Sequence, residues 1–405
     1  MSITHPLRIS SYRYFILTRF FLTYAYQIIA VVIGWHIYKL TNDVLALGLI
    51  GLAEAVPAIS IALFAGHVAD KHNRKKIMQF SMLTMLLGAI GLLLVTNNSF
   101  PKTLQVNAIY GLIMLIGLGR GFYAPAGQAI LNQLVNKEQL VKGSTFYSTT
   151  WQIASIAGPA SAGFLYNYYG ITNSFIVIIG LFSISFTFLS LIKVKKHVVS
   201  MNHDSIWLNL AEGIKYVLNH KIILGALSLD LFSVLFGGAV ALLPAFAHEI
   251  LNVGPQGLGY LRAAPSLGAS ITMIAFSFYG SFKNPGQTLI IVVAAFGICM
   301  IGFGLSTNFY LSILLLFLSG AFDSISVIIR GAIMQIFVPD NMRGRVSSIN
   351  TIFIGSSNEI GAFESGVAAR FLGLAPSVVF GGTATLIVVL SAQWKAKALK
   401  TMKFL

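Results

Sequence analysis

The residues VLALGLIGLAEAVPAISIALFAGHVADKHNRKK, 44–76, join a long apolar run to a short basic loop. The run expected over 44–66 exceeds the roughly 20 residues with which a helix crosses a bilayer. No backbone group can stay unpaired in hydrocarbon, so such a run must be helical. One acid, Glu54, lies near its middle. The stretch therefore predicts a membrane-spanning helix that ends in a polar loop.

The whole chain has the same character. It is 405 residues long, 56% hydrophobic and only 10% charged, whereas soluble domains carry roughly 25% charged residues. Further apolar runs of similar length predict membrane helices near 15–38, 44–66, 76–96, 104–126, 144–167, 171–192, 222–247, 256–279, 287–305, 309–332, 346–370 and 374–394. We expect an all-α membrane protein of twelve transmembrane helices.

The net charge of +15 reports orientation. Of the 27 lysines and arginines, 20 fall in alternate loops and at the termini, and three fall in the opposite set of loops. Lys and Arg concentrate on the cytoplasmic side of a membrane. Both termini are therefore expected in the cytoplasm of a bacterial inner membrane, and nucleic-acid binding is not needed to explain the basic excess.

A weak internal repeat divides the chain. An offset of 203 places Gly117 on Gly320, Gly158 on Gly361 and Gly163 on Gly366, and an offset of 211 places Gly48 on Gly259. We expect a six-helix half at 1–192, a cytoplasmic linker at 193–221 with a short amphipathic helix near 207–218, and a second six-helix half at 222–405. Transporters built from such repeats hold substrate near mid-membrane at the repeat interface.

The loop GHVADKHNRKK, 66–76, resembles the conserved loop G-x-x-x-D-[RK]-x-G-R-[RK] of the major facilitator superfamily. The segments VPDNMRGRV, 338–346, and SSNEIGAFESG, 356–366, resemble its drug and siderophore efflux branch, which includes enterobactin exporters. The resemblance implies the two-half major facilitator fold and a transporter. Asn73 replaces the usual glycine of the loop, and Asn is the next-best residue for a left-handed backbone.

The resemblance implies a conformational latch in that loop. In the family, the loop acid and its basic neighbours attach to the start of the eleventh helix when the cytoplasmic side closes. A carboxylate near a helix N-terminus is stabilised there. The residues that match are Gly66, Asp70, Lys71, Arg74 and Lys75. The alternative is that the basic residues only fix orientation.

Ionisable residues inside spans are costly and usually functional. The repeat aligns Arg19 with Asp230 and Arg120 with Asp323, and Arg330 lies nearby in sequence. These cavity charges can pair across the halves as a gate, bind opposite ends of a polar substrate, or pair within their own half to support packing. Arg19 and Arg120 lie within roughly two turns of the cytoplasmic boundary, which favours a gate.

Glu54 and Glu359 are the candidates for proton coupling, with Asp230 and Asp323 as competitors. Glu54 and Glu359 lie near the middle of their spans. A carboxyl group in a low-dielectric environment can exchange a proton near neutral pH. The alternative is a hydrogen-bonded acid that serves helix packing.

Two other groups of residues have packing and functional interpretations. Gly158, Pro159 and Gly163 resemble the antiporter motif of the fifth span, and they are also ordinary helix-packing residues. Aromatic and amide side chains could line a pocket for an aromatic substrate or simply pack; they are Tyr24, Tyr26, Gln27, Trp35, Tyr123 and Phe232.

The sequence therefore predicts a proton-coupled exporter of a small amphiphilic compound, a siderophore or a drug, working as a monomer by alternating access. The alternatives are an importer or lipid transporter on the same fold, and a transport-dead sensor or scaffold. The chain shows no nucleophile and base set, phosphate loop or metal-ligand cluster, and its single cysteine is Cys299. We expect no enzyme activity, no metal and no cofactor; the partners are the substrate, protons and membrane lipids.

Overall fold

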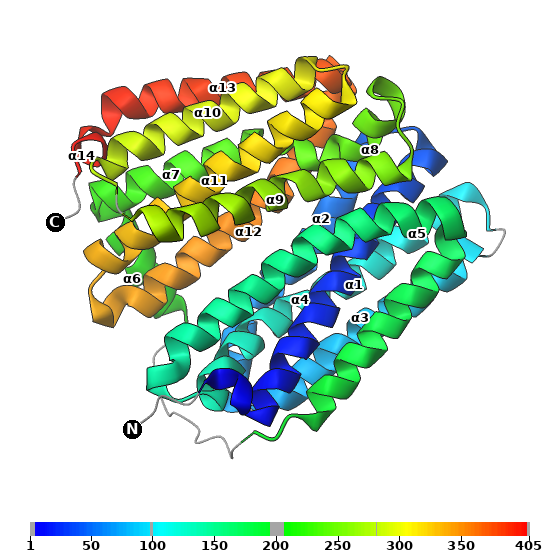
Figure 1. The fold of residues 1–405 in the computed structure, drawn as a ribbon, viewed down its shortest axis with the longest axis horizontal. Coiled ribbons are helices and arrows are strands. Elements are labelled where there is room, and N and C mark those ends of the chain that lie inside the picture. The colour runs from blue at the N-terminus through cyan, green and yellow to red at the C-terminus, as the bar shows by residue number, and fades with distance from the viewer. Residues whose placement is uncertain (1–4, 98–99, 195–205, 281, 403–405) are drawn as a thin grey trace. The chain divides into compact units, whose positions relative to one another are not determined.

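The computed structural model describes residues 5–97, 100–194, 206–280 and 282–402. Throughout these residues the chain forms helices and short connections, without a strand (Figure 1). The elements are η1 (Pro6–Arg8), α1 (Ser10–Thr41), α2 (Val44–Lys71), α3 (Arg74–Asn97), α4 (Lys102–Leu134), η2 (Lys137–Gln139), α5 (Leu140–Leu191), α6 (Ile206–Asn219), α7 (Lys221–Phe236), η3 (Ala239–Leu242), α8 (Leu243–Ala245), η4 (Phe246–Ile250), α9 (Pro255–Tyr279), α10 (Pro285–Leu305), α11 (Phe309–Phe337), α12 (Asp340–Leu372), α13 (Leu374–Lys395) and α14 (Lys397–Lys400). The all-helical membrane fold expected from the sequence is confirmed.

Two of the expected spans have a different form from the prediction. The spans at 144–167 and 171–192 are the two arms of the 52-residue α5, which turns back at Gly170, where φ is 74° (Figure 1). Such a backbone angle favours glycine. The span expected over 222–247 is not one continuous helix. It breaks after α7, because Gly237 lies against the ring of Phe296 and Gly238 lies against the carbonyl oxygen of Gly361.

Among the described residues, ten helices are long and apolar enough to cross a membrane, with the double-length α5 counted once. The α12 helix is not one of them, although it has 33 residues. Its middle carries Asn350, Asn358 and Glu359. A helix of this polarity is compatible with a membrane only where protein or water shields its polar face.

Large apolar side chains are exposed on the outside of several helices, as lipid contact requires. Phe80 is 56% exposed, Phe278 is 81% exposed and Trp394 is 80% exposed. In a soluble protein such side chains would favour association. Here they are the expected surface toward hydrocarbon.

Packing separates the chain into two compact units. The first unit comprises Met1–Thr41, Leu52–Asn202 and Gly254–Gly259, and the second comprises Asn42–Gly51, His203–Val253 and Tyr260–Leu405. The beginning of α2 thus packs with the second unit, and the beginning of α9 packs with the first. The segments assigned to the opposite unit are thus the beginnings of two helices, α2 and α9, that the offset of 211 aligns.

Close helix contacts follow the repeat. A Cβ atom added at Gly117 would lie 2.3 Å from the carbonyl oxygen of Glu54, and one added at Gly320 would lie 2.0 Å from that of Pro265. Gly320 is 203 residues after Gly117, and Pro265 is 211 residues after Glu54. The two offsets found in the sequence therefore describe equivalent α2–α4 and α9–α11 contacts.

The same two offsets relate the glycines of α5 and α12. Gly158 lies against the carbonyl oxygen of Tyr24, and Gly361 lies against that of Leu235. The glycines that the repeat aligns are thus places where two helix backbones approach closely. Small residues permit such approach in membrane helices.

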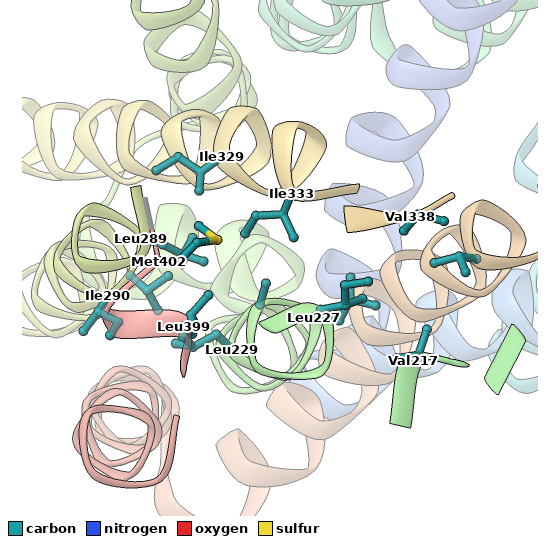
Figure 2. Packing of buried hydrophobic residues seen from close by; sticks show 14 of the residues in the cluster. Val217, Leu227, Leu229, Leu289, Ile290, Ile329, Ile333, Val338, Leu399 and Met402 are labelled. Atoms are coloured by element: carbon teal, nitrogen blue, oxygen red, sulfur yellow. The ribbon is translucent and has the colours of Figure 1, made fainter. Parts of the chain in front are cut away.

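An apolar core of the second unit joins the C-terminal segment to the helices. Leu399 and Met402 pack beside Leu289 and Ile290 of α10, and Leu229 of α7 lies against them (Figure 2). A Cβ atom at Gly286 would lie 1.7 Å from the carbonyl oxygen of Leu399, so no larger residue fits there. The C-terminal segment is therefore held in the unit.

The short helix predicted near 207–218 is present as α6, while the assignment of 193–221 as a cytoplasmic linker stays a prediction. The α6 helix packs on α12, and Tyr216 Oη donates a 2.8 Å hydrogen bond to the carbonyl oxygen of Phe337 at the end of α11. Glu212 forms an ion pair with Arg345 near the start of α12. The linker helix is thus attached to the second unit beside the α11–α12 connection.

Candidate functional site

Three side chains form a charged cluster inside the first unit. Arg120 of α4 forms an ion pair with Glu54 of α2 and donates a 2.8 Å hydrogen bond to Tyr26 Oη of α1. The hydroxyl of Tyr26 donates to the same carboxylate, and the guanidinium carbon lies 4.9 Å from the centre of the tyrosine ring. The Glu54 side chain is 13% exposed and that of Arg120 is 44% exposed. The carboxylate is therefore largely shielded while the cation keeps access to its surroundings.

Close helix packing places this cluster. Gly117 and Gly121 flank Arg120 one turn apart on α4, and they lie against the backbone of Glu54 and Ala58 on α2. Small residues four apart let two helices approach until their backbones touch. A short distance between α2 and α4 then holds the carboxylate of one helix beside the guanidinium of the other.

Arg19 of α1 lies in the same unit, and within the described residues of this unit no carboxylate pairs with it. Its guanidinium carbon lies 3.3 Å from the ring centre of Tyr147 on α5, and its buried Nε atom has no hydrogen-bond partner there. Tyr123 of α4 is near enough to interact electrostatically with both residues, and its buried hydroxyl also has no partner in the described part. Tyr147 was not singled out in the sequence.

The second unit contains a buried ion pair. Arg330 of α11 binds Asp230 of α7, both side chains are 7% exposed, and Arg330 Nε donates a 3.3 Å hydrogen bond to Ser326 Oγ. Asp230 and Asp323 line a small cavity together with Ser233 and Ser326. Its size is on the order of one water molecule. Two acids and one arginine therefore meet in this cluster.

Three of the cavity charges pair within their own unit: Arg120 binds Glu54, and Asp230 binds Arg330. These two pairs fit the interpretation in which each charge pairs inside its own half, and the three interpretations stay predictions. The Gly117-x-x-x-Gly121 spacing in the sequence signals close helix packing beside Arg120, but it does not say which helix packs there.

Glu359 of α12 faces the beginning of α2 in the second unit. A Cβ atom added at Gly51 would lie 3.6 Å from Glu359 Oε2 and 2.9 Å from the Cβ atom of Ala362. Glu359 is partly buried, so it occupies a packed part of α12. Of the two coupling candidates, Glu54 thus belongs to α2 in the first unit, and Glu359 lies beside the beginning of α2 in the second unit.

The basic loop after α2 stabilises helix ends in the first unit. Lys75 Nζ donates hydrogen bonds of 2.7 and 2.8 Å to the carbonyl oxygens of Ser190 and Ile192 at the end of α5, and Arg74 donates to Ala129 on α4. The surroundings of Gly66 and the side chains of Asp70 and Lys71 lie outside the described part of the structure. The latch therefore stays a prediction.

The expected left-handed backbone at Asn73 is not observed. The residues with positive φ other than glycine are Asn42 and Asn252 in the described chain. The Asn73 side chain instead accepts hydrogen bonds from the backbone N–H groups of Lys75 and Lys76, at 3.0 and 3.3 Å. Asn is a preferred residue for capping the N-terminus of a helix, and here it begins α3.

The helix-packing motif of α5 contacts two helices. Gly158 lies against Gln27 and Tyr24 of α1. The carbonyl oxygen of Pro159 lies 2.6 Å from a Cβ atom built at Gly259, and a Cβ at Gly163 would lie 2.5 Å from the carbonyl oxygen of Pro255. The three residues thus form a packing surface for α1 and for the beginning of α9. Within the described residues, no group of three His, Cys, Asp or Glu side chains gathers as metal ligands would.

Comparison with solved structures identifies the fold. The nucleoside transporter NupG aligns with a TM-score of 0.76 at 12% identity, covering 96% of this chain and 99% of that chain. The xylose transporter XylE from E. coli, in its inward open conformation, aligns with a TM-score of 0.70 at 12% identity, covering 96% and 98%. Both are transporters, and at this identity the similarity concerns the fold alone.

Comparison with curated sequences points in the same direction. The enterobactin exporter EntS of Shigella flexneri is 25% identical over 391 residues, covering 95% of this chain and 90% of that protein. EntS of Escherichia coli O1:K1 matches with the same identity and coverage. The sequence profile of the Major Facilitator Superfamily matches residues 15–362. With the helical fold and the repeated helix contacts, this match shows that the chain is a multi-pass membrane transporter, not an enzyme, and belongs to the Major Facilitator Superfamily.

Proposed function

We propose that this chain exports a small amphiphilic compound of the siderophore or drug class in exchange for protons. The relatives named as enterobactin exporters cover nearly the whole chain, which supports export and this class of substrate. We place the protein in a bacterial inner membrane as a monomer with both termini in the cytoplasm. The positive charges of alternate loops support this orientation.

The observation that carries proton coupling is the cluster of Glu54, Arg120 and Tyr26. Within residues 10–192, Glu54 is the only acid in the middle of an expected span. Its carboxylate is bound by one guanidinium and one phenol. Protonation of Glu54 removes the charge that holds Arg120, so the cation is released toward its surroundings. The pair can thus exist in two arrangements that differ by one proton.

Two such arrangements are what coupling requires. A proton shifts a conformational equilibrium only if it binds one conformation more tightly than the other. A conformation that keeps Arg120 on Glu54 disfavours the proton, and a conformation that moves Arg120 away favours it. Alternation between these conformations would load and release a proton once in each cycle. Glu359, facing the start of α2 in the second unit, is the second carrier candidate.

The test is substrate-driven proton movement in proteoliposomes that carry a pH-sensitive dye. A panel of siderophores and amphiphilic drugs is applied to the wild-type protein and to Glu54→Gln, Glu359→Gln and Asp323→Asn. Glu138→Gln is the matched control, because this acid is exposed in η2 outside the expected spans. We expect Glu54→Gln to lower proton movement at least about tenfold, since a general proton-transfer group contributes on the order of 10²–10⁴-fold.

The outcomes separate the parts of the proposal. If substrate crosses the membrane without proton movement, export stands and coupling is overturned. Loss of proton movement in Glu359→Gln alone would assign the carrier to the second unit. If none of the compounds is transported, the proposed substrate class is wrong.

The latch is a further part of this proposal. Asp70, with Lys71, Arg74 and Lys75, is proposed to bind the start of α12 when the cytoplasmic side closes. The start of α12 offers a helix N-terminus, where a carboxylate is stabilised by roughly 0.3–1 kcal/mol. Asp70→Asn should lower the transport rate and leave substrate binding unchanged.

A further inference from the structure

Arg19 differs from Arg120 and Arg330 in how its positive charge is accommodated. Arg120 is neutralised by Glu54 and Arg330 by Asp230, each within its own unit. Arg19 lies on α1 among helices of the first unit, and within the described residues of that unit no carboxylate neutralises it and its buried Nε atom has no hydrogen-bond partner. A cation inside a membrane protein without an anion is costly.

The surroundings of Arg19 are aromatic and hold unused polar atoms. The guanidinium lies on the face of Tyr147, 3.3 Å from the ring centre, and the ring of Phe15 is stacked on Tyr147 with 5.4 Å between ring centres. A cation on an aromatic face is attracted by the ring and keeps its N–H edge free for other partners. The stacking therefore holds the guanidinium in place without neutralising it.

Tyr123 gives an independent indication of a ligand. Only 7% of this residue is exposed, and its hydroxyl finds no partner in the described part of the chain. A buried hydroxyl without a hydrogen bond is costly, and such groups in native proteins usually meet a ligand or water. Built at Gly127, a Cβ atom would lie 3.3 Å from Tyr147 Oη and 3.8 Å from Tyr123 Cε1, so both rings reach the same place.

From this geometry we propose that Arg19, Tyr123 and Tyr147 form a subsite in the first unit for an oxyanion, a carboxylate or a deprotonated phenol, on the transported molecule. The planar guanidinium fork matches a carboxylate with two hydrogen bonds. The tyrosine hydroxyls supply further donors, and the rings accommodate an aromatic group beside the anion. The inference rests on the proposed function only in taking the occupant to be the transported molecule.

The repeat gives the proposal a second argument. The position equivalent to Arg19 in the second unit is Asp230, which is already bound to Arg330. The two units therefore treat this position differently: one neutralises its charge internally, and the other leaves a cation for an external anion. The subsite predicts a preference for substrates that carry at least one negative charge.

The test compares an anion with a neutral molecule of the same shape. Binding of salicylate and salicylamide to the purified full chain in detergent is measured by equilibrium dialysis near pH 6.5, where salicylate is an anion and the phenol of salicylamide stays protonated. Wild type should bind salicylate at least about tenfold more tightly than salicylamide. Arg19→Gln should reduce this preference to less than about twofold, and Arg19→Lys should retain part of it. Arg13→Gln is the matched control, an exposed arginine on the same helix.

Two results would overturn the proposal: equal binding of the two probes by wild type, or an unchanged preference in Arg19→Gln. The first needs no variant, so misfolding of a variant cannot hide it. Tyr123→Phe, which removes the buried hydroxyl and keeps the ring, should weaken salicylate binding several-fold and leave salicylamide binding unchanged. The assay contains no membrane and no gradient, so it can succeed while proton-coupled export fails, and the reverse.

Discussion

Arg330 is the central residue of the buried charge cluster in the second unit, because Asp230 and Asp323 both lie near it. Removal of one partner of a buried ion pair leaves the other charge uncompensated and typically costs about 3–5 kcal/mol. We expect Arg330→Met to destabilise the protein by about 3 kcal/mol. Thermal unfolding of the detergent-solubilised protein checks this expectation. Arg330→Met with Asp230→Asn should recover part of the loss, since no unpaired Asp230 charge remains.

The control for this prediction is the exposed pair of Arg343 and Asp340 at the start of α12, whose side chains are 56% and 87% exposed. Exposed ion pairs contribute about 0–1 kcal/mol. Arg343→Gln should therefore barely change the unfolding temperature. Equal effects of the two arginine substitutions would show that the buried cluster is not a stabilising feature.

The residue scale also shows how far the sequence could locate the site. It singled out Arg19, Glu54, Arg120, Asp230 and Arg330 because ionisable residues in spans are rare, and this reasoning needs no coordinates. It could not give the partners, because pairing depends on which helix faces meet. Arg120 was aligned with Asp323 by the repeat, yet in the structure it binds Glu54. Tyr147 was missed because an aromatic residue in a membrane span carries no distinguishing signal.

At the scale of helices, the α2–α4 contact should be sensitive to a single methyl group. A Cβ atom at Gly117 would lie 2.3 Å from the carbonyl oxygen of Glu54, and a backbone atom cannot rotate away. Gly117→Ala should therefore separate the helices, destabilise the protein by about 1–3 kcal/mol as overpacking does, and weaken the Glu54–Arg120 pair. Gly111→Ala on the same helix has nothing within 4 Å of its Cβ and should be neutral in thermal unfolding.

The equivalent contact in the second unit gives a separate prediction. Gly320 of α11 approaches Pro265 of α9 as Gly117 approaches Glu54. Gly320→Ala should lower the unfolding temperature by a similar amount, while Gly331→Ala on the same helix has open space and should not. If Gly320→Ala changes the unfolding temperature as little as Gly331→Ala does, the Gly320 contact does not contribute to stability as the Gly117 contact is expected to.

The elements themselves were largely predictable, and their interruptions were predictable only in part. Apolar length fixes where a membrane helix must run, so each expected span falls on helix in the structure, with an interruption in the span at 222–247. The break after Phe236 falls at the adjacent glycines Gly237 and Gly238, which weaken a helix locally. The sequence does not show that these glycines also pack against Phe296 and Gly361, which are distant along the chain. The cap at Asn73 was misjudged because Asn suits both a left-handed turn and a helix N-terminus.

At the scale of the whole molecule, the fold was predictable because two independent signals agree. Hydropathy gives the spans, and the offsets of 203 and 211 give the repeat. The structure shows these offsets again as paired backbone contacts, at Gly117 and Gly320 and at Gly158 and Gly361. Orientation in the membrane is a different matter. It rests on the distribution of Lys and Arg, which the helical packing does not test.

The chain offers a direct test of orientation, because its single cysteine, Cys299, is buried and can be replaced. In a Cys299→Ala background, one new cysteine is placed at Lys76 in the basic first turn of α3, or at Thr307 between α10 and α11. Both positions are exposed. With both termini in the cytoplasm, Thr307→Cys should react in intact cells with a thiol reagent that cannot cross the membrane.

Lys76→Cys should react only after the cells are permeabilised. The two positions check each other, because a chain in the membrane with one orientation cannot expose both loops on one side. The reverse pattern would place the basic loop outside and would remove the latch from the cytoplasmic face. Labelling of both positions in intact cells would indicate mixed orientation, and the charge distribution would then not determine how this chain inserts.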